Sequence, residues 1–197
     1  MKIYTKTGDD GETGLLGSVR VSKSNLAINV CGSLDETNST IGVARSALGA
    51  NVSEAGNETG FDDVEKVLNE IQNDLFDIGS QVASCLAKSQ SVTDFPDSRS
   101  GELEKEIDRF ESELPALTAF ILPGGSAVGS SLHLARSVCR RAERELVVLI
   151  ESGIESPLKT ELIYLNRLGD LLFVLARVAN LRTQSPETKW IARDKKS

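Results

Sequence analysis

Four arginines fall between residues 136 and 144 of this otherwise acidic chain. On a helix, Arg136, Arg140 and Arg144 lie one turn apart and therefore share a face, with Glu143 beside them. Guanidinium forks are suited to bidentate recognition of phosphate or carboxylate groups. The pattern predicts an anion site on this helix, or alternatively a basic face that pairs with acidic neighbours in a subunit interface.

A second cluster, rich in glycine and hydroxyl groups, lies near the start of the chain in the run TKTGDDGET at residues 5–13. Its glycines let backbone N–H groups approach a ligand, and Lys6 can contact phosphate oxygens. The run is not a Walker loop, because the pattern GxxxxGK[ST] is absent from the chain. It indicates a polyphosphate cradle or, more simply, a glycine-rich turn.

A third cluster places polar residues inside the leucine-rich segment 164–173 and just beyond it. Asn166, Asp170, Phe173 and Arg177 follow one another at helical spacing and so lie near one face. Polar groups inside such a helix are costly unless they find partners. We expect this face to meet the arginine helix, either through structural ion pairs or around a bound nucleotide.

Two single residues carry less specific information. His133 is the only histidine, and no specific Ser–His–Asp or Cys–His arrangement can be proposed around it. We interpret it as a core or interface histidine with satisfied hydrogen bonds. One histidine also excludes a carboxylate-bridged metal protein, which needs Glu-x-x-His on two helices. Trp190 either folds over a large apolar ligand or is a stray aromatic.

The segments that must position these clusters show helical periodicity. Apolar residues from 64 to 85 alternate spacings of four and three, which is typical of a helix in a bundle. The run from Ser33 to Glu36 fits a capping box, so the first helix is predicted to begin there and end at Gly49. Three more helices are expected at about 103–114, 130–150 and 160–181, with polar loops at 51–62 and 88–100. The predicted fold class is all-α, a five-helix bundle with an ordered N-terminal loop.

The whole chain, residues 1–197, is long enough for one domain. We divide it into an N-terminal loop (1–32), a helical bundle (33–182) and a polar, mobile tail (183–197). The net charge of −7 argues against nucleic acid or an anionic membrane as a general partner. No apolar run approaches the ~18 residues of a membrane span. Because the polar start also lacks a signal-peptide core, we expect a cytoplasmic protein.

Together the three clusters resemble, in order and separation, the ATP:cob(I)alamin adenosyltransferases of the propanediol-utilisation and mitochondrial type. The matching motifs span nearly the whole chain and are YTKTGDDGETG (4–14), GSLDETNSTIG (32–42), FILPGG (120–125), LHLARSVCRRAER (132–144) and YLNRLGDLLF (164–173). The resemblance implies that the 5′-deoxyadenosyl group of ATP moves to the cobalt of cob(I)alamin, which yields adenosylcobalamin and triphosphate. It also implies magnesium with ATP, a homotrimer with active sites between subunits, and a reductase and an adenosylcobalamin-dependent acceptor enzyme as possible partners.

The resemblance assigns roles to the matching positions. From the loop, ATP would be held by Thr5, Lys6, Thr7, Gly8, Thr13, Gly14 and Lys23. From the helices, ATP would be held by Arg140, Arg141, Glu143, Arg144 and Asn166. Asp35 and Arg136 would form a salt bridge across the subunit boundary, and Phe120 would press on the lower face of the corrin. The expected catalytic residues are thus Asp35, Phe120, Arg136 and Arg140.

The implied chemistry agrees with the residue types. Cob(I)alamin is itself a strong nucleophile, so the protein needs no catalytic base and must instead align the ribose carbon and stabilise the leaving triphosphate. Gly169 and Thr37 depart from the serine and leucine usual in the family, and neither is expected to touch an ATP contact. Two rival functions are a carrier that delivers adenosylcobalamin and a structural bundle whose arginines only join subunits.

Overall fold

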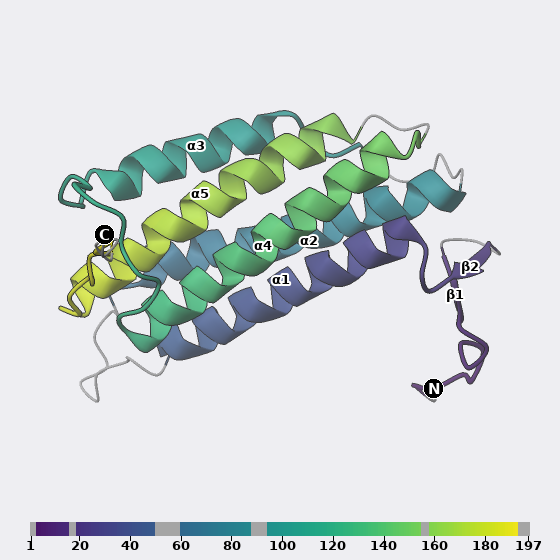
Figure 1. The fold of residues 1–197 in the computed structure, drawn as a ribbon, viewed down its shortest axis with the longest axis horizontal. Helices are drawn as coiled ribbons and strands as arrows, with labels where there is room; N and C mark the ends of the chain where they lie inside the picture. Colours follow the sequence, from purple (N-terminus) through teal and green to yellow (C-terminus); the bar gives the residue numbers. More distant parts are fainter. Residues whose placement is uncertain (1–2, 16–18, 50–59, 88–93, 155–157, 193–197) are drawn as a thin grey trace, which may run out of the picture.

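The computed structural model describes residues 3–15, 19–49, 60–87, 94–154 and 158–192. Five long helices lie side by side, and a short β-hairpin projects beyond one end of the bundle (Figure 1). The elements are β1 (Glu12–Gly14), β2 (Arg20–Ser22), α1 (Leu26–Gly49), α2 (Asp62–Ala87), α3 (Ser98–Glu111), α4 (Ala127–Glu151) and α5 (Lys159–Arg182). The predicted helical bundle is confirmed. Residues 51–59 of the predicted loop 51–62 and residues 88–93 of the predicted loop 88–100 lie outside the described part of the chain, and α3 already begins inside the second loop.

The core is formed by apolar seams on all five helices. The seam predicted for α2 is buried, since Val64, Leu68 and Ile78 are completely inaccessible to solvent. α5 packs against both α3 and α4, while α1 packs against α4 and α2. Burial of these side chains supplies the main favourable free energy of folding. The consequence for function is a rigid support that holds the arginines of α4 at fixed positions.

The first helix begins at Leu26, so the predicted start at Ser33 is wrong. Asn25 caps the helix, because its Oδ1 accepts a hydrogen bond from the backbone N–H of Ala27 at 2.9 Å. Ser33 lies in the interior of α1, where its hydroxyl donates to Glu145 Oε2 on α4 at 2.6 Å. The Ser33 hydroxyl, which the local pattern assigned to a helix cap, therefore binds a residue of another helix instead.

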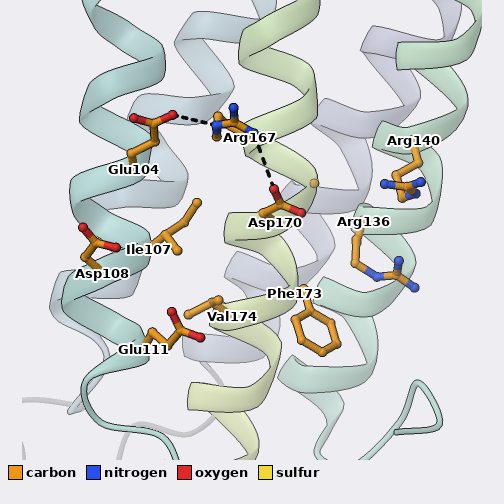
Figure 2. Close-up of a pocket in the computed structure, with 11 residues that line it drawn as sticks. Glu104, Ile107, Asp108, Glu111, Arg136, Arg140, Arg167, Asp170, Phe173 and Val174 are labelled. Carbon is orange, nitrogen blue, oxygen red and sulfur yellow. Dashed lines mark hydrogen bonds and ion pairs between the residues drawn. The ribbon is translucent and has the colours of Figure 1, made fainter. Parts of the chain in front are cut away.

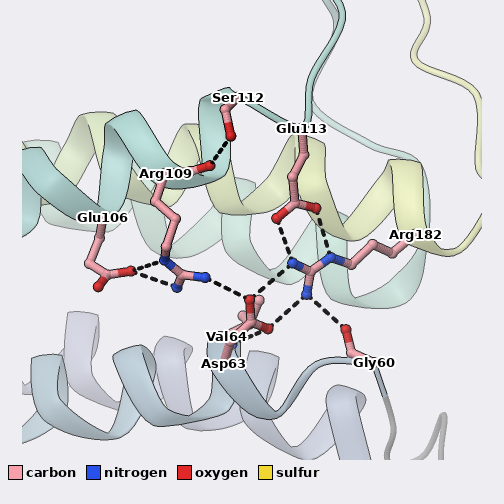
Figure 3. Close-up of polar contacts among 8 residues, drawn as sticks. All are labelled: Gly60, Asp63, Val64, Glu106, Arg109, Ser112, Glu113 and Arg182. Atoms are coloured by element: carbon pink, nitrogen blue, oxygen red, sulfur yellow. Dashed lines mark hydrogen bonds and ion pairs between the residues drawn. The ribbon is translucent and has the colours of Figure 1, made fainter.

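An ion-pair network joins three helices at the end of the bundle opposite the hairpin (Figure 3). Asp63, in the first turn of α2, accepts hydrogen bonds from Arg182 at 2.8 and 3.0 Å and from Arg109 at 2.9 Å. Arg182 also donates to Glu113 at 2.7 Å. These contacts, with the Arg182 hydrogen bonds as the largest cause, hold the pKa of Asp63 well below its ordinary value. The network fixes the ends of α2, α3 and α5 relative to one another.

The chain after α5 packs against the loop before α4, which corrects the prediction of a mobile tail as far as Trp190. We call residues 184–191 the tail strap. The backbone N–H of Trp190 donates to the carbonyl of Phe120 at 2.7 Å, and that of Leu122 donates to Thr188 at 2.8 Å. The Trp190 and Phe120 rings meet edge to face with centroids 6.4 Å apart. Trp190 is therefore not a stray aromatic; residues 193–197 lie outside the described part of the chain.

Candidate active site

A cleft with a volume of about 450 Å³ lies over α5, between α3 and α4 (Figure 2). Its walls differ in charge, because α4 contributes arginines while α3 contributes carboxylates. The lining residues are Glu104, Ile107, Asp108 and Glu111 of α3, Arg136 and Arg140 of α4, and Arg167, Gly169, Asp170, Phe173 and Val174 of α5. The carboxylates of α3 were missed in the sequence, where they resemble an ordinary solvent-facing helix surface.

Arg136 and Arg140 line this cleft from successive turns of α4 (Figure 2). Neither guanidinium forms an ion pair with any residue that the structure describes. The Nε of Arg136 is also buried without a hydrogen-bond partner among those residues. Unpaired guanidinium groups on the wall of a cleft are suited to bind an anion. This observation favours the predicted anion site over a fully neutralised structural face.

The other predicted ATP residues on the helices are engaged within the chain. Arg141 forms an ion pair with Glu36 of α1. Asn166 donates from Nδ2 to Glu143 Oε1 at 2.8 Å, which joins α5 to α4. Arg144 donates to the carbonyl of Arg140 at 2.9 Å. These contacts orient the side chains beside the cleft, and in this conformation they also satisfy part of their hydrogen-bonding capacity.

The polar face predicted on α5 meets α4 only in part. Asp170 and Phe173 line the cleft opposite Arg136, as the helical spacing indicated. Arg177 instead points toward the tail strap, where its Nε donates to Glu187 at 2.9 Å. The sequence could not distinguish these two directions, because the partner of Arg177 lies beyond the end of its helix.

The N-terminal residues predicted to hold phosphate lie on the hairpin or in the segments directly before and after it, and the hairpin extends away from the bundle (Figure 1). Lys23 Nζ donates to the carbonyl of Gly8 at 2.8 Å, and the hydroxyls of Thr5 and Thr7 lie 2.8 Å apart. These contacts fold the loop that contains Lys6 back onto the hairpin. Within one chain, the hairpin is thus separate from the cleft that holds the two unpaired arginines.

Asp35 lies apart from Arg136. It lines a second hollow of about 260 Å³ between α1 and α2, next to the exposed ring of Phe76. Asp35 is exposed and forms no ion pair with a described residue of its own chain. The two members of the predicted pair therefore do not meet within one subunit.

Two smaller expectations from the sequence are corrected here. His133 is buried, but neither ring nitrogen has a hydrogen-bond partner among the described residues, so the expected satisfied histidine is not found. Burial, followed by the charge of Arg136, lowers the pKa of His133. Gly169 does adjoin a predicted ATP residue, since a Cβ atom there would lie 3.6 Å from Arg140 Cγ. That spacing is an ordinary contact, so the serine usual in the family would also fit.

Comparisons with known proteins agree on one family. The family described as cobalamin adenosyltransferase matches residues 3–179. The corrinoid adenosyltransferase of Bacillus subtilis is 44% identical over 93% of this chain and 89% of its own length. The human corrinoid adenosyltransferase MMAB is 38% identical over 98% of this chain and 74% of its own length. Two solved variants of a PduO-type ATP:corrinoid adenosyltransferase from Lactobacillus reuteri, both complexed with cobalamin and ATP, are similar to this chain. The first has a TM-score of 0.83 and 34% sequence identity, and the match covers 96% of both chains. The second has a TM-score of 0.84 and 33% identity, and the match covers 97% of this chain and 100% of the other.

This chain belongs to the cobalamin adenosyltransferase family. It is thus an enzyme of the corrinoid adenosyltransferase class, which uses ATP and a corrinoid as substrates. Among the described residues, no helix is both long and apolar enough to cross a membrane.

Proposed function

We propose that this chain transfers the 5′-deoxyadenosyl group of ATP to the cobalt of cob(I)alamin. An electron pair of cob(I) forms the new bond to C5′ of the ribose, and the C5′–O bond breaks with its electrons passing to the triphosphate. The observation that supports this proposal most strongly is the guanidinium group of Arg140, which lines the cleft and forms no ion pair with a described residue. A highly charged leaving group requires fixed cations of this kind.

We propose that ATP is held from two sides. Thr5, Lys6, Thr7, Gly8, Thr13, Gly14 and Lys23 would hold it from the N-terminal loop, and Arg140, Arg141, Glu143, Arg144 and Asn166 from the helices. Among the described residues, no three His, Cys, Asp or Glu side chains are grouped to hold a metal ion. Magnesium would therefore enter with the phosphate oxygens of ATP, as part of the substrate, and not as a resident ion.

The site would be completed by assembly into the homotrimer that the family resemblance implies. The hairpin points away from its own bundle (Figure 1), and Asp35 and Arg136 lie on different surfaces of one chain. A neighbouring copy can bring its Asp35 to Arg136 and its hairpin to the cleft. The exposed ring of Phe76 beside Asp35 supports a subunit contact at this surface.

Phe120 would cover the lower face of the corrin and keep the cobalt free of its lower axial ligand, which eases reduction to cob(I)alamin. Its ring is 78% exposed although it is a large aromatic, which is consistent with a role in binding a large apolar surface. We also propose a cytoplasmic location, supported by three free cysteines, with a reductase supplying the electron and an adenosylcobalamin-dependent enzyme accepting the product.

The carrier alternative can be tested by binding. In the absence of a corrinoid, the wild-type chain should bind Mg-ATP in an equilibrium titration, because the side chains of Arg140 and Lys6 are available to phosphate. A carrier that only delivers the product would bind adenosylcobalamin and leave Mg-ATP unbound. Binding of adenosylcobalamin without binding of Mg-ATP would contradict the transferase proposal and support the carrier function.

Asp35→Asn is expected to weaken both assembly and transfer, because it removes the charge that would pair with Arg136 of a neighbouring copy. We expect a larger fraction of dissociated chains in sedimentation velocity at low protein concentration, together with a lower rate. Glu151→Gln, at the exposed end of α4, removes the same charge and should change neither property. If Asp35→Asn left both the trimer and the transfer rate unchanged, Asp35 would have no role between subunits.

A further inference from the structure

The loop that carries Phe120 is fixed at its start by a buried arginine of α5. Arg177 is 4% exposed, and its Nη2 donates to the carbonyl of Pro115 at 2.9 Å. Its Nε donates to Glu187 Oε1 at 2.9 Å. A buried guanidinium needs such partners, because an unpaired charge in the interior is strongly unfavourable. Arg177 therefore joins the start of this loop to the tail strap.

Asn180, one turn further along α5, fixes the other end of the same loop. Its Nδ2 donates to the carbonyl of Gly124 at 2.9 Å, and its Oδ1 accepts from the backbone N–H of Ser126 at 2.8 Å. Gly125 has a φ of +108°, and a Cβ atom there would lie 2.3 Å from Asn180 Oδ1. Only glycine fits at this position, which gives a structural reason for the PGG motif.

The tail strap supports the middle of the loop. Its backbone pairs with residues 120–122 through the hydrogen bonds of Trp190 and Leu122 and the bridge between Ile121 and Lys189. The Phe120 ring itself is mostly exposed, so little packing of its own fixes its direction. The backbone constraints at both ends and along the strap therefore determine where the ring projects.

We propose that Arg177 and Glu187 are positioning residues for the corrin: their ion pair places the tail strap, and the strap places Phe120. This inference rests on the proposed function, in which Phe120 meets the lower face of the corrin. Arg177 and Glu187 line a separate hollow of about 280 Å³ together with Asn180 and do not line the cleft of Arg136. Their effect should therefore be confined to the corrin and spare ATP.

The first test is Glu187→Gln, which keeps the shape of the side chain and removes its charge. Steady-state kinetics with each substrate varied in turn should show kcat/KM for cob(I)alamin lowered by roughly 10- to 100-fold, a loss typical of a reacting group displaced by about 1 Å. The KM for ATP should not change. The absorbance spectrum of bound cob(II)alamin should show a smaller fraction without the lower axial ligand.

Asp63→Asn is the matched control, because it also removes a carboxylate from an ion pair with an α5 arginine but does not touch the loop or the strap. We expect it to lower thermal stability without a selective effect on the corrin. Equal effects of Asp63→Asn and Glu187→Gln on the cob(I)alamin kinetics would mean that the role of Glu187 is only structural, and would overturn the inference.

A double-mutant cycle tests whether Glu187 acts through Phe120. In a Phe120→Ala background, Glu187→Gln should cause no further loss in kcat/KM for cob(I)alamin, because the group that it positions is gone. Independent, multiplicative losses would contradict the inference. Wild-type protein that fails to transfer adenosyl would instead overturn the proposed function, and the inference with it.

A second pair of variants addresses the strap without touching the buried ion pair. Trp190→Ala keeps the backbone N–H that donates to Phe120, whereas Trp190→Pro removes it. Trp190 is exposed, so folding of the bundle should not depend on its side chain. We expect the proline variant to lose more cob(I)alamin kcat/KM than the alanine variant. Equal losses would show that the strap backbone does not position Phe120.

Discussion

Replacing Arg140 with alanine is expected to lower kcat for adenosyl transfer by about 10²- to 10³-fold, the loss found when a fixed donor to a developing negative charge is removed. The side chain is exposed and unpaired in the cleft, so its removal takes away a phosphate partner and leaves the apolar core untouched. Stopped-flow measurement of corrin absorbance under anaerobic conditions, at saturating ATP, gives the rate directly. Circular dichroism should show an unchanged helical fold.

Lys105→Ala provides the control for Arg140→Ala. Lys105 is an exposed cation on α3 that does not line the arginine cleft, so the loss of one positive charge there should leave the rate near that of the wild type. Arg140→Lys is expected to recover only part of the rate, because an ammonium group cannot form a bidentate contact. Normal turnover of Arg140→Ala with saturating ATP would refute the assignment of this residue.

Asp74→Ala is expected to cause the largest loss of stability, about 3 kcal/mol in the free energy of unfolding, as for other broken buried pairs. Asp74 is buried and accepts a hydrogen bond from Tyr164 at 2.6 Å and from Arg99 Nε at 3.1 Å. Burial, and then the Asp74 carboxylate, raise the pKa of Tyr164 well above its ordinary value, so the hydroxyl stays protonated and donates. The substitution leaves that hydroxyl buried without an acceptor.

Urea unfolding at one fixed chain concentration measures this loss, because the proposed assembly would make the measured stability depend on concentration. Glu102→Ala is the comparison: Glu102 pairs with the same Arg99, but its side chain is 45% exposed. An exposed pair contributes at most about 1 kcal/mol. Similar losses for the two variants would show that the buried contacts of Asp74 do not set the stability.

The helices could be predicted from the sequence because burial follows a local period. Val64, Leu68 and Ile78 recur at the spacing of one helical face, and that face is buried. The start of α1 could not be predicted in the same way. The SLDE run satisfies a capping pattern, yet Ser33 donates to Glu145 on another helix, a contact that no local pattern contains.

The residues of the cleft could be predicted where their spacing within a single helix places them on one face. The spacing of Arg136 and Arg140, and that of Asp170 and Phe173, correctly placed them on facing surfaces. The tail strap was not predictable, because its pairing with residues 120–122 depends on contacts far apart in the sequence. For the same reason, Arg177 was expected at the cleft and lies instead against Glu187.

The most direct test of the central claim is anaerobic conversion of cob(I)alamin. Purified protein is mixed with chemically reduced cob(I)alamin and Mg-ATP, and the corrin absorbance and the released phosphates are followed together. We predict protein-dependent formation of adenosylcobalamin, with one triphosphate released for each adenosyl group transferred. An unchanged cob(I)alamin spectrum with intact ATP, in the presence of folded and assembled protein, would contradict the transferase function.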